Sequence, residues 1–311
     1  MILYKIKLKP ESAFGSPPIS DTIFGNLIWS FVHIGIDVDK LLSNYMEEPF
    51  LVVSDFFLDD LGVTPKIPSV YTVGKNKKEK LDILMNRKEV KNRAYIPIDF
   101  LIKEKKLSKK IVLEKSESIS KNIYMKSHVV RCSINRITGT TGEGFTPYSL
   151  VENFYKNNFF TFYFKCEESF CEKVIDALSY MGQVGFGKDA TVGKGKFSVL
   201  KDSFEKIDLG DSSFNDIYTL SNLYMYNIPA KEAFYEPFTR FGKHGDILAI
   251  TGNPFKNPVV TARQGAILLG IPADILKKGY IGSGIKGLSY HENTVYQGYS
   301  LFIPHKYEVE Q

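Results

Sequence analysis

The first residues alternate between apolar and polar side chains. Tyr4, Ile6 and Leu8 share one side of an extended chain, and three lysines alternate with them on the other side. A period of two is typical of a half-buried strand. The pattern therefore predicts a strand from about Ile2 to Lys9, which the segment "SAFGSPPIS" ends with a glycine and two prolines.

A helical pattern follows this break. The apolar residues after it recur three or four positions apart, at Ile23, Phe24, Leu27, Ile28 and Phe31. This spacing predicts an amphipathic helix, and Ser20 or Asp21 can cap its first turn. The chain thus begins with a strand, a loop and a helix.

The same order returns later in the first half of the chain. After the apolar run "PFLVVSDFFLD", the segments "NNFFTFYFKC", "SFCEKVIDALSYM" and "KFSVL" predict a strand, a helix and a strand. Two βαβ units on one antiparallel sheet are typical of a ferredoxin-like α+β fold. We expect residues 1–203 to form such a domain, of the kind found in RNA-recognition motifs.

The two units are separated by a lysine-rich insertion and a predicted hairpin. Residues 74–120 are polar and predict helix broken by loops, while residues 121–150 alternate β-branched and polar side chains around a Gly/Thr-rich turn. From residue 75 to 131 there are seventeen Lys or Arg and seven Asp or Glu, in a chain whose net charge is only +5. A basic block of this kind is typical of nucleic-acid contact, although a solvated insertion explains it equally well.

The second half, residues 204–311, contains fewer helical patterns. Strands are predicted near "YTLSNLYMYN", "GDILAIT" and "AILLG", and the glycine-rich segment "GYIGSGIKGLS" precedes a last run, "TVYQGYSLFIP". Each half therefore has a glycine-rich segment before its final strand. This parallel predicts that the second half is a related ferredoxin-like domain.

Composition excludes several classes of protein. With 43% apolar and 24% charged residues, the chain has the composition of a globular protein, and it contains no run of eighteen apolar residues. Its N-terminus lacks the features of a signal peptide, so we expect a cytoplasmic protein without a membrane partner. The three cysteines, Cys132, Cys166 and Cys171, form no CxxC pair, which predicts inert or buried thiols and no structural zinc.

The stretch "MGQVGFGKDATVGKGKF", from Met181 to Phe197, contains five glycines and three lysines. It fits GxxxxGK, but Asp189 stands where a phosphate-binding loop needs Ser or Thr, and the segment lies between a helix and a strand instead of between a strand and a helix. The same reversed order excludes a dinucleotide fingerprint. We instead expect exposed peptide amides and the three lysines to hold the phosphates of an RNA strand, the alternative being a flexible turn.

Four segments, in this order along the chain, resemble a known family. They are "KPESAFGSPPISDTIFGNLIWSF", "RCSINRITGTT", "GQVGFGKDATVGKGKF" and "TVYQGYSLFIP". Together they are similar to the signatures of subunit four of the Csm complex, the RAMP-superfamily subunit of type III-A CRISPR effectors that is related to the Cas five group. The lysine-rich insertion has no counterpart in this resemblance.

The resemblance implies a non-catalytic subunit with two ferredoxin-like domains that binds the repeat-derived 5′ tag of the guide RNA and caps one end of the complex. It implies two protein partners, a large polymerase-type subunit and a filament-forming RAMP subunit. It also implies that the segment from His128 to Gly139 is a thumb, or the base of a thumb, that touches the guide. No cofactor is implied.

The candidate RNA-binding residues fall into four groups. The glycine loop contributes Gly185, Phe186, Gly187, Lys188, Gly193, Lys194, Gly195 and Lys196. The hairpin contributes His128, Arg131, Asn135, Arg136 and Thr138, the N-terminal loop contributes Phe14, Gly15 and Ser20, and the second glycine-rich segment contributes Gly282, Ser283, Gly284 and Lys286. Phe14, Phe186 and Tyr280 are candidates for stacking on bases.

Catalysis is the main alternative. The chain has no HEXXH, GGDD or HD motif for a metal-dependent nuclease or cyclase. Metal-independent cleavage of repeat RNA would use His128 or His33 with a nearby lysine, whereas His244 is predicted in a turn, His291 beside the second glycine-rich segment and His305 in the tail. A protein adaptor without RNA contact is the third possibility.

Overall fold

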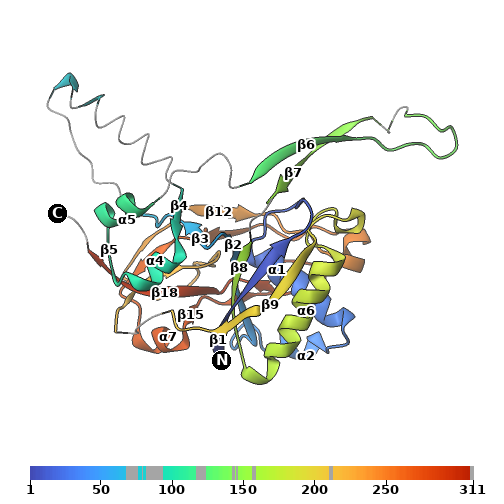
Figure 1. The fold of residues 1–311 in the computed structure, drawn as a ribbon. Coiled ribbons are helices and arrows are strands. Elements are labelled where there is room, and N and C mark those ends of the chain that lie inside the picture. Colours follow the sequence, from blue (N-terminus) through green and yellow to red (C-terminus); the bar gives the residue numbers. More distant parts are fainter. Residues whose placement is uncertain are drawn as a thin grey trace.

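The structure is a computed structural model that describes residues 1–67, 76–78, 80–81, 94–116, 124–141, 144, 146–155, 159–209 and 213–308. Its first sheet has four strands in the order β2-β8-β1-β9, and neighbouring strands are antiparallel. These strands are β1 (Ile2–Pro10), β2 (Leu51–Leu58), β8 (Phe160–Cys166) and β9 (Phe197–Lys206). Helices α1 (Ser20–His33) and α6 (Cys171–Val184) pack against each other, and α2 (Val38–Leu42) follows α1 (Figure 1).

The predicted start of α1 is corrected in one detail. Neither Ser20 nor Asp21 caps the helix, because Ile19 is the N-cap residue and provides no side-chain hydrogen bond. The backbone N–H of Ser20 instead donates to Oδ1 of Asp55 on β2, at 2.7 Å. A carboxylate from a distant strand therefore satisfies the helix terminus, which no local pattern predicts.

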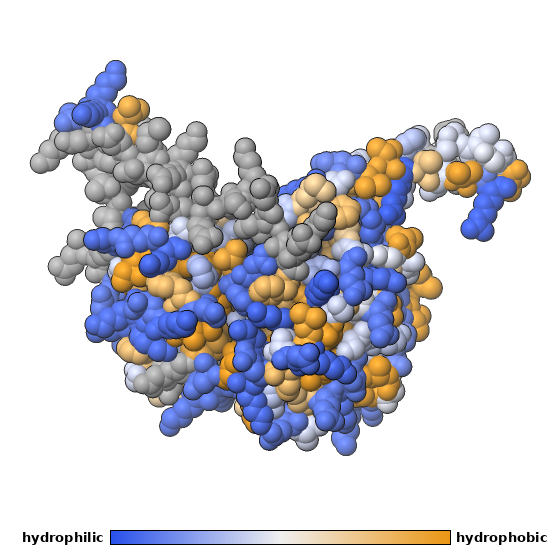
Figure 2. Space-filling model, viewed as in Figure 1, coloured by the Kyte–Doolittle hydropathy of each residue, from blue (hydrophilic) through white to orange (hydrophobic). Residues whose placement is uncertain are grey.

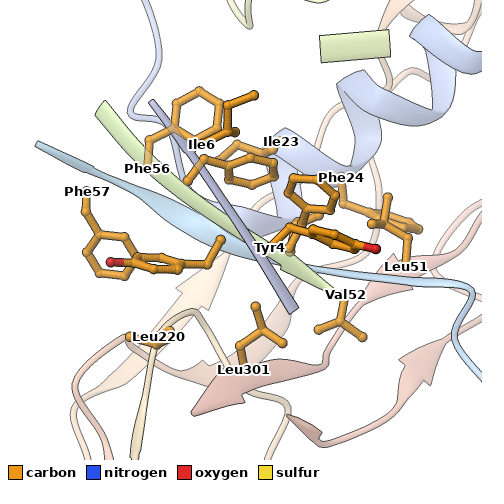
Figure 3. Close-up of a cluster of buried hydrophobic side chains, with 14 of the residues drawn as sticks. Tyr4, Ile6, Ile23, Phe24, Leu51, Val52, Phe56, Phe57, Leu220 and Leu301 are labelled. Carbon is orange, nitrogen blue, oxygen red and sulfur yellow. The ribbon is translucent and has the colours of Figure 1, made fainter. Parts of the chain in front are cut away.

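The four-stranded sheet is covered on both faces. Figure 3 shows Ile23 and Phe24 of α1 on the same side of the strands as Ile6, and Leu220 and Leu301 from the second half of the chain on the opposite side. All five side chains are buried in one hydrophobic cluster. The two halves therefore share a core, and the boundary between residues 203 and 204 stays a prediction.

The second half forms another antiparallel sheet with the order β11-β14-β10-β18-β15. Its strands are β10 (Asp216–Thr219), β11 (Glu232–Phe234), β14 (Ile267–Leu269), β15 (Tyr280–Ile281) and β18 (Ser300–Glu308). Shorter ladders join β12 (Pro237–Arg240) to β13 (Val259–Ala262) and β16 (Gly284–Ile285) to β17 (Tyr296–Gln297). An α+β fold with antiparallel sheets is confirmed.

A second ferredoxin-like domain is not confirmed. Among the described residues after β9, the only α-helix is α7 (Ala273–Lys278), which has six residues, whereas a ferredoxin-like unit has two helices. The strand predicted at "GDILAIT" is also wrong. Asp246–Ile250 forms a 3₁₀ helix, η3, whose Ile247 and Ile250 are exposed and pair with no strand.

The lysine-rich insertion is described only in part, since most of "KNKKEKLDILMNRKEVKNR" lies outside the described residues. The described part contains β4 (Tyr95–Pro97), which pairs with β3 (Leu61–Val63), then α4 (Ile98–Lys103), β5 (Lys106–Ser108) and α5 (Lys109–Lys115). Strand β5 pairs in parallel with the end of β18, with Lys106 opposite Lys306. The insertion is thus attached to the last strand of the chain.

The structure also tests the predictions about the cysteines, His305 and a membrane span. Cys166 and Cys171 are buried as predicted, but Cys132 is exposed at the end of a hairpin strand. His305 is buried within β18 and does not belong to a tail. Within the described ranges, no helix is both long enough and apolar enough to cross a membrane.

Candidate nucleic-acid interface

Three segments that are far apart in the sequence meet at one end of the first sheet, next to the end of β1 and the starts of β8 and β9. They are residues 11–16, the hairpin of β6 (Met125–Arg131) and β7 (Tyr148–Phe154), and the glycine loop at residues 185–196. Phe14 and Asn153 exchange two backbone hydrogen bonds, of 2.9 and 3.0 Å, and the N–H of Gly195 donates to the carbonyl of Ala13 at 2.8 Å. The N-terminal segment is therefore held between the hairpin and the loop.

The amides of the glycine loop are largely used inside the protein. The N–H of Phe186 donates to the carbonyl of Gly195 at 3.0 Å and closes the loop. The N–H groups of Lys188 and Lys196 donate to the hydroxyls of Ser16 and Ser12, at 3.0 and 2.8 Å.

This bonding corrects the expectation of a bare backbone. Among the described residues, the loop amides without an acceptor are those of Asp189, Ala190 and Thr191, at the start of the 3₁₀ turn η2 (Ala190–Val192). The lysine side chains, and not a row of free amides, are therefore the main polar groups that the loop offers to solvent.

Internal packing also explains the glycines. At Gly195, φ is +69°, and a Cβ atom would lie inside van der Waals contact of the Phe186 carbonyl oxygen. At Gly187, φ is +74°, and a Cβ would lie 2.8 Å from Cβ of Ser16. These glycines let the loop fold onto itself and onto the N-terminal segment, which is a requirement of the fold.

A buried carboxylate joins the loop to the hairpin. Glu152 on β7 is 2% exposed. Its Oε2 forms an ion pair with Lys194 of the loop, and its Oε1 lies 3.4 Å from a guanidinium nitrogen of Arg131 on β6. Because a buried charge is stable only when it is paired, the carboxylate fixes both cations in place. Lys194 and Arg131 thus have structural partners in addition to any ligand.

The hairpin projects from the body of the molecule, as predicted (Figure 1). Its register pairs Met125 with Phe154 and Arg131 with Tyr148. Side chains on its surface are mixed in character (Figure 2): Lys126, His128 and Arg136 are exposed, and so are apolar residues such as Ile137 and Tyr148. Beyond β6, Oδ1 of Asn135 accepts from the N–H of Ile137 at 2.9 Å, and the Thr138 and Thr140 hydroxyls are hydrogen-bonded, so Asn135 shapes a turn.

Positive charge dominates the solvent-facing part of these segments. We use the name basic edge for the cations of the hairpin and the loop that reach solvent, namely Lys126, Arg131, Arg136, Lys188 and Lys196. In the described parts of the three segments, the acidic residues are the exposed Glu11, the buried, ion-paired Glu152 and the partly exposed Asp189. The basic edge can therefore attract a polyanion.

Three of the predicted contact residues lie in the core. Phe14 and Phe186 are fully buried and pack on each other, with ring centroids 5.9 Å apart, and Ser20 is also fully buried. Their side chains are not available for a base or phosphate, so the stacking predicted for Phe14 and Phe186 is wrong. Gly15 is a packing position, because a Cβ there would lie 2.5 Å from the Lys188 carbonyl oxygen.

The second glycine-rich segment lies on the α2 side of the molecule. A Cβ at Gly284 would lie 2.9 Å from the ring of Tyr45, and Nζ of Lys286 donates to the carbonyl of Ser43 at 3.2 Å. Gly282 and Ser283 connect β15 to β16 against residue 298. Tyr280 is half-buried, with its ring edge-on to Tyr299 at 5.7 Å. The sequence grouped this segment with the glycine loop, but its neighbours are different.

The two candidate catalytic histidines, His33 and His128, have different surroundings. Nε2 of His33, the last residue of α1, lies 2.8 Å from a carboxylate oxygen of Asp246. His128 is exposed on β6, directly opposite Val151, and its imidazole ring has no hydrogen-bond partner among the described residues. Across those residues, no group of three His, Cys, Asp or Glu side chains is suited to hold a metal ion.

Sequence reasoning missed the groups that assemble this site. Glu152 shares one face of β7 with Leu150 and Phe154, so a single carboxylate on an otherwise apolar face was the available signal. Ser12, Ser16 and Asn26 accept hydrogen bonds from N–H groups of the glycine loop, and no sequence pattern predicts this role. Their role depends on the close approach of the two segments.

Comparisons with known proteins identify the fold. No protein-family model and no curated protein matches the chain. Among solved structures, a chain of the Csm3-Csm4 subcomplex of the type III-A CRISPR-Cas interference complex matches with a TM-score of 0.59 at 13% identity, covering 98% of this chain and 100% of that one. Chains of the Csm1-Csm4 cassette in complex with cA4 and with AMPPNP match with TM-scores of 0.57 and 0.55 at 15% identity, covering all of both chains. The resemblance drawn from the sequence is thus confirmed at the level of the fold.

Proposed function

We propose that this chain is the subunit of a type III-A CRISPR effector that corresponds to Csm4 and that binds the 5′ tag of the guide RNA. The observation that carries the proposal is the convergence of the N-terminal segment, the hairpin and the glycine loop, joined through Glu152, into one basic edge. The whole-chain likeness to structures that contain Csm4 supports it.

The chemistry of the basic edge suits a single strand of RNA. The backbone N–H groups of Lys188 and Lys196 bind Ser16 and Ser12, and the two lysine residues are exposed. Lys126 and Arg136 are exposed on the hairpin and add to the positive charge. Such cations fix the path of a phosphate backbone, and exposed aromatic rings stack on splayed bases. Tyr148, which is 47% exposed, replaces Phe14 and Phe186 as the candidate stacking residue.

The proposed partners follow from the matched structures. The Csm1-Csm4 cassette and the Csm3-Csm4 subcomplex each contain Csm4 with one other Csm protein. By this likeness, the chain would bridge a large Csm1-like subunit and a Csm3-like filament subunit and cap the guide. In the proposal it is cytoplasmic, and it has no chemistry of its own.

The RNA contact is tested by fluorescence anisotropy with a labelled tag RNA and the full chain. Because each neutralised phosphate releases counterions, log affinity should fall with log salt concentration at a slope of roughly −0.7 per phosphate engaged. Binding with this slope supports the proposal. Absence of binding, or binding that is insensitive to salt, favours the adaptor and contradicts the proposal.

The endoribonuclease alternative needs a separate assay. The purified protein is incubated with repeat RNA in the presence of EDTA, and the products are resolved by electrophoresis. We expect intact RNA. Cleavage at one site that disappears in His128→Ala or His33→Ala would show that the chain is an enzyme.

A further inference from the structure

A cavity of about 540 Å³ opens on a different part of the molecule from the basic edge. Its walls come from α1, α2, the loop at residues 241–258 between β12 and β13, and residues 290–295. None of the residues that line it belongs to the hairpin or the glycine loop. The proposed RNA contact therefore leaves this cavity without a role.

Hydrogen bonds between distant segments hold the cavity walls. Asp246 of the loop pairs with His33 of α1 at 2.8 Å, and Nε2 of His244 lies 2.6 Å from the hydroxyl of Ser289. Nδ2 of Asn293 donates to Oδ1 of Asp39 at the start of α2, at 3.1 Å. Each wall is tied to another, so the cavity is formed before anything occupies it.

Apolar side chains line the cavity, and others are exposed on the adjoining 3₁₀ turn η3. Trp29 and Leu248 line the cavity, together with Val32 and with Tyr290, which is 83% exposed. Ile247 and Ile250, on either side of Leu248 in η3, are 65% and 87% exposed. Large side chains of this kind grouped around a hollow are typical of a surface that another molecule covers.

The charges at the cavity determine which kind of molecule fits. The exposed charged residues that line it are two carboxylates, Asp39 and Glu292. Of the basic groups that line the cavity, Lys256 is half-buried, and burial together with Lys256 and His291 lowers the pKa of His244 to about 4, so that its ring is neutral at pH 7. An acidic opening disfavours RNA phosphates and favours a lysine or arginine.

From this combination we infer that the cavity is the docking site for a protein partner that inserts an apolar side chain past Tyr290 and places a lysine or arginine against Asp39 and Glu292. The inference rests on the proposed function in one respect, because it assumes that the partner is a protein subunit of the same complex. The occupant is a protein and not nucleic acid, because the exposed charge at the opening is negative.

The single tryptophan of the chain provides a direct probe, because Trp29 lines the cavity. The full chain is labelled with 5-fluorotryptophan, which gives one ¹⁹F resonance, and is titrated with each purified protein partner of the proposed function and with the 5′-tag RNA. We expect the resonance to shift or broaden with one of the protein subunits. Tag RNA alone should leave it unchanged.

Matched substitutions test the surface around the cavity. Tyr290→Asp and Ile250→Asp place a charge at exposed positions, so the fold should be retained, and each should weaken binding of that subunit about tenfold or more. Ile137→Asp is the control, because Ile137 is 95% exposed on the hairpin. It should leave subunit binding at the cavity unchanged.

The outcomes separate this inference from the proposed function. If a subunit co-elutes with the chain while the Trp29 resonance stays unchanged and both cavity variants bind normally, the docking site is refuted and the proposed function stands. If the resonance responds to tag RNA instead, the cavity is a nucleic-acid site and the inference is wrong. If neither subunit nor tag RNA binds the unaltered chain, both are refuted.

Discussion

The basic edge and the cavity are built in opposite ways. At the basic edge, a glycine loop folds onto residues 12–16, a buried glutamate holds two cations, and lysines extend into solvent. At the cavity, Val32 and Tyr290 are exposed apolar side chains, while His244 is buried and Lys256 is half-buried. The first arrangement suits a flexible polyanion, and the second suits a protein side chain. In the two proposals, one chain keeps an RNA contact and a protein contact apart in space.

The largest effect on stability is expected at Gly195, where the backbone of the glycine loop packs most closely. In Gly195→Ala the new Cβ would meet the Phe186 carbonyl at a positive φ, which should lower the free energy of unfolding by about 4 kcal/mol. The matched change Gly193→Ala also has a positive φ but has no atom within 4 Å, so it should cost only about 1 kcal/mol. Chemical denaturation measures both. Equal losses would show that the close packing at residue 195 is unimportant.

The next effect concerns the ion pair that joins the loop to the hairpin. Lys194→Met leaves the buried Glu152 with Arg131 as its only cation and should cost about 3 kcal/mol. Lys188→Met, at an exposed lysine of the same loop, should change stability by less than about 0.5 kcal/mol. A small loss at both positions in urea denaturation would mean that Glu152 is not held by Lys194.

The stability of the folded chain should depend on pH through His244, which lines the cavity. The pKa of His244 is about 4 in the folded chain and about 6.5 in the unfolded chain. The contribution of the neutral ring to the free energy of unfolding is therefore complete above pH 6.5 and is lost as the pH falls toward 4. At pH 5 the loss in the free energy of unfolding is at most about 2 kcal/mol relative to pH 7, because solvent screens part of the shift. His244→Gln keeps a side chain that can hydrogen-bond Ser289 and should remove this part of the acid destabilisation. Identical pH profiles of unfolding for the two proteins would contradict the assignment.

A smaller effect is expected on RNA affinity. The double change Lys188→Ala and Lys196→Ala removes two exposed cations of the basic edge and should weaken tag binding about tenfold, with a salt slope shallower by roughly 1.4. Thermal stability should stay unchanged. The control is the double change Lys40→Ala with Lys243→Ala, at two exposed lysines outside the hairpin and the glycine loop. An equal loss of affinity in the control would mean that charge acts non-specifically.

Local patterns predicted the elements of the first half well. The alternation at Ile2–Lys9 became β1, and the helical spacing at Ile23–Phe31 became α1, because in both cases the side chains that repeat are those that the core buries. "GDILAIT" failed for the converse reason. Its apolar residues are exposed around a cavity, so hydrophobicity there does not indicate a buried strand.

The candidate site was predicted only as separate segments. The glycine loop and the hairpin were found from their composition, and the structure brings them together. The ion pairs of Glu152 join residues 21 and 42 positions apart, and the serine acceptors and the burial of Phe14 and Phe186 depend on contacts between residues more than a hundred positions apart. Local spacing encodes none of these contacts. The cavity was not predicted at all, since three segments far apart in sequence form its walls.

Site-specific photo-cross-linking tests the separation of the two contacts most directly. p-Benzoylphenylalanine is placed in the full chain at position 128 on the hairpin or at position 290 at the cavity, two exposed sites, and the chain is irradiated in the assembled complex. The account predicts that position 128 cross-links to guide RNA and that position 290 cross-links to a protein subunit. RNA attached at position 290, with none at position 128, would contradict it.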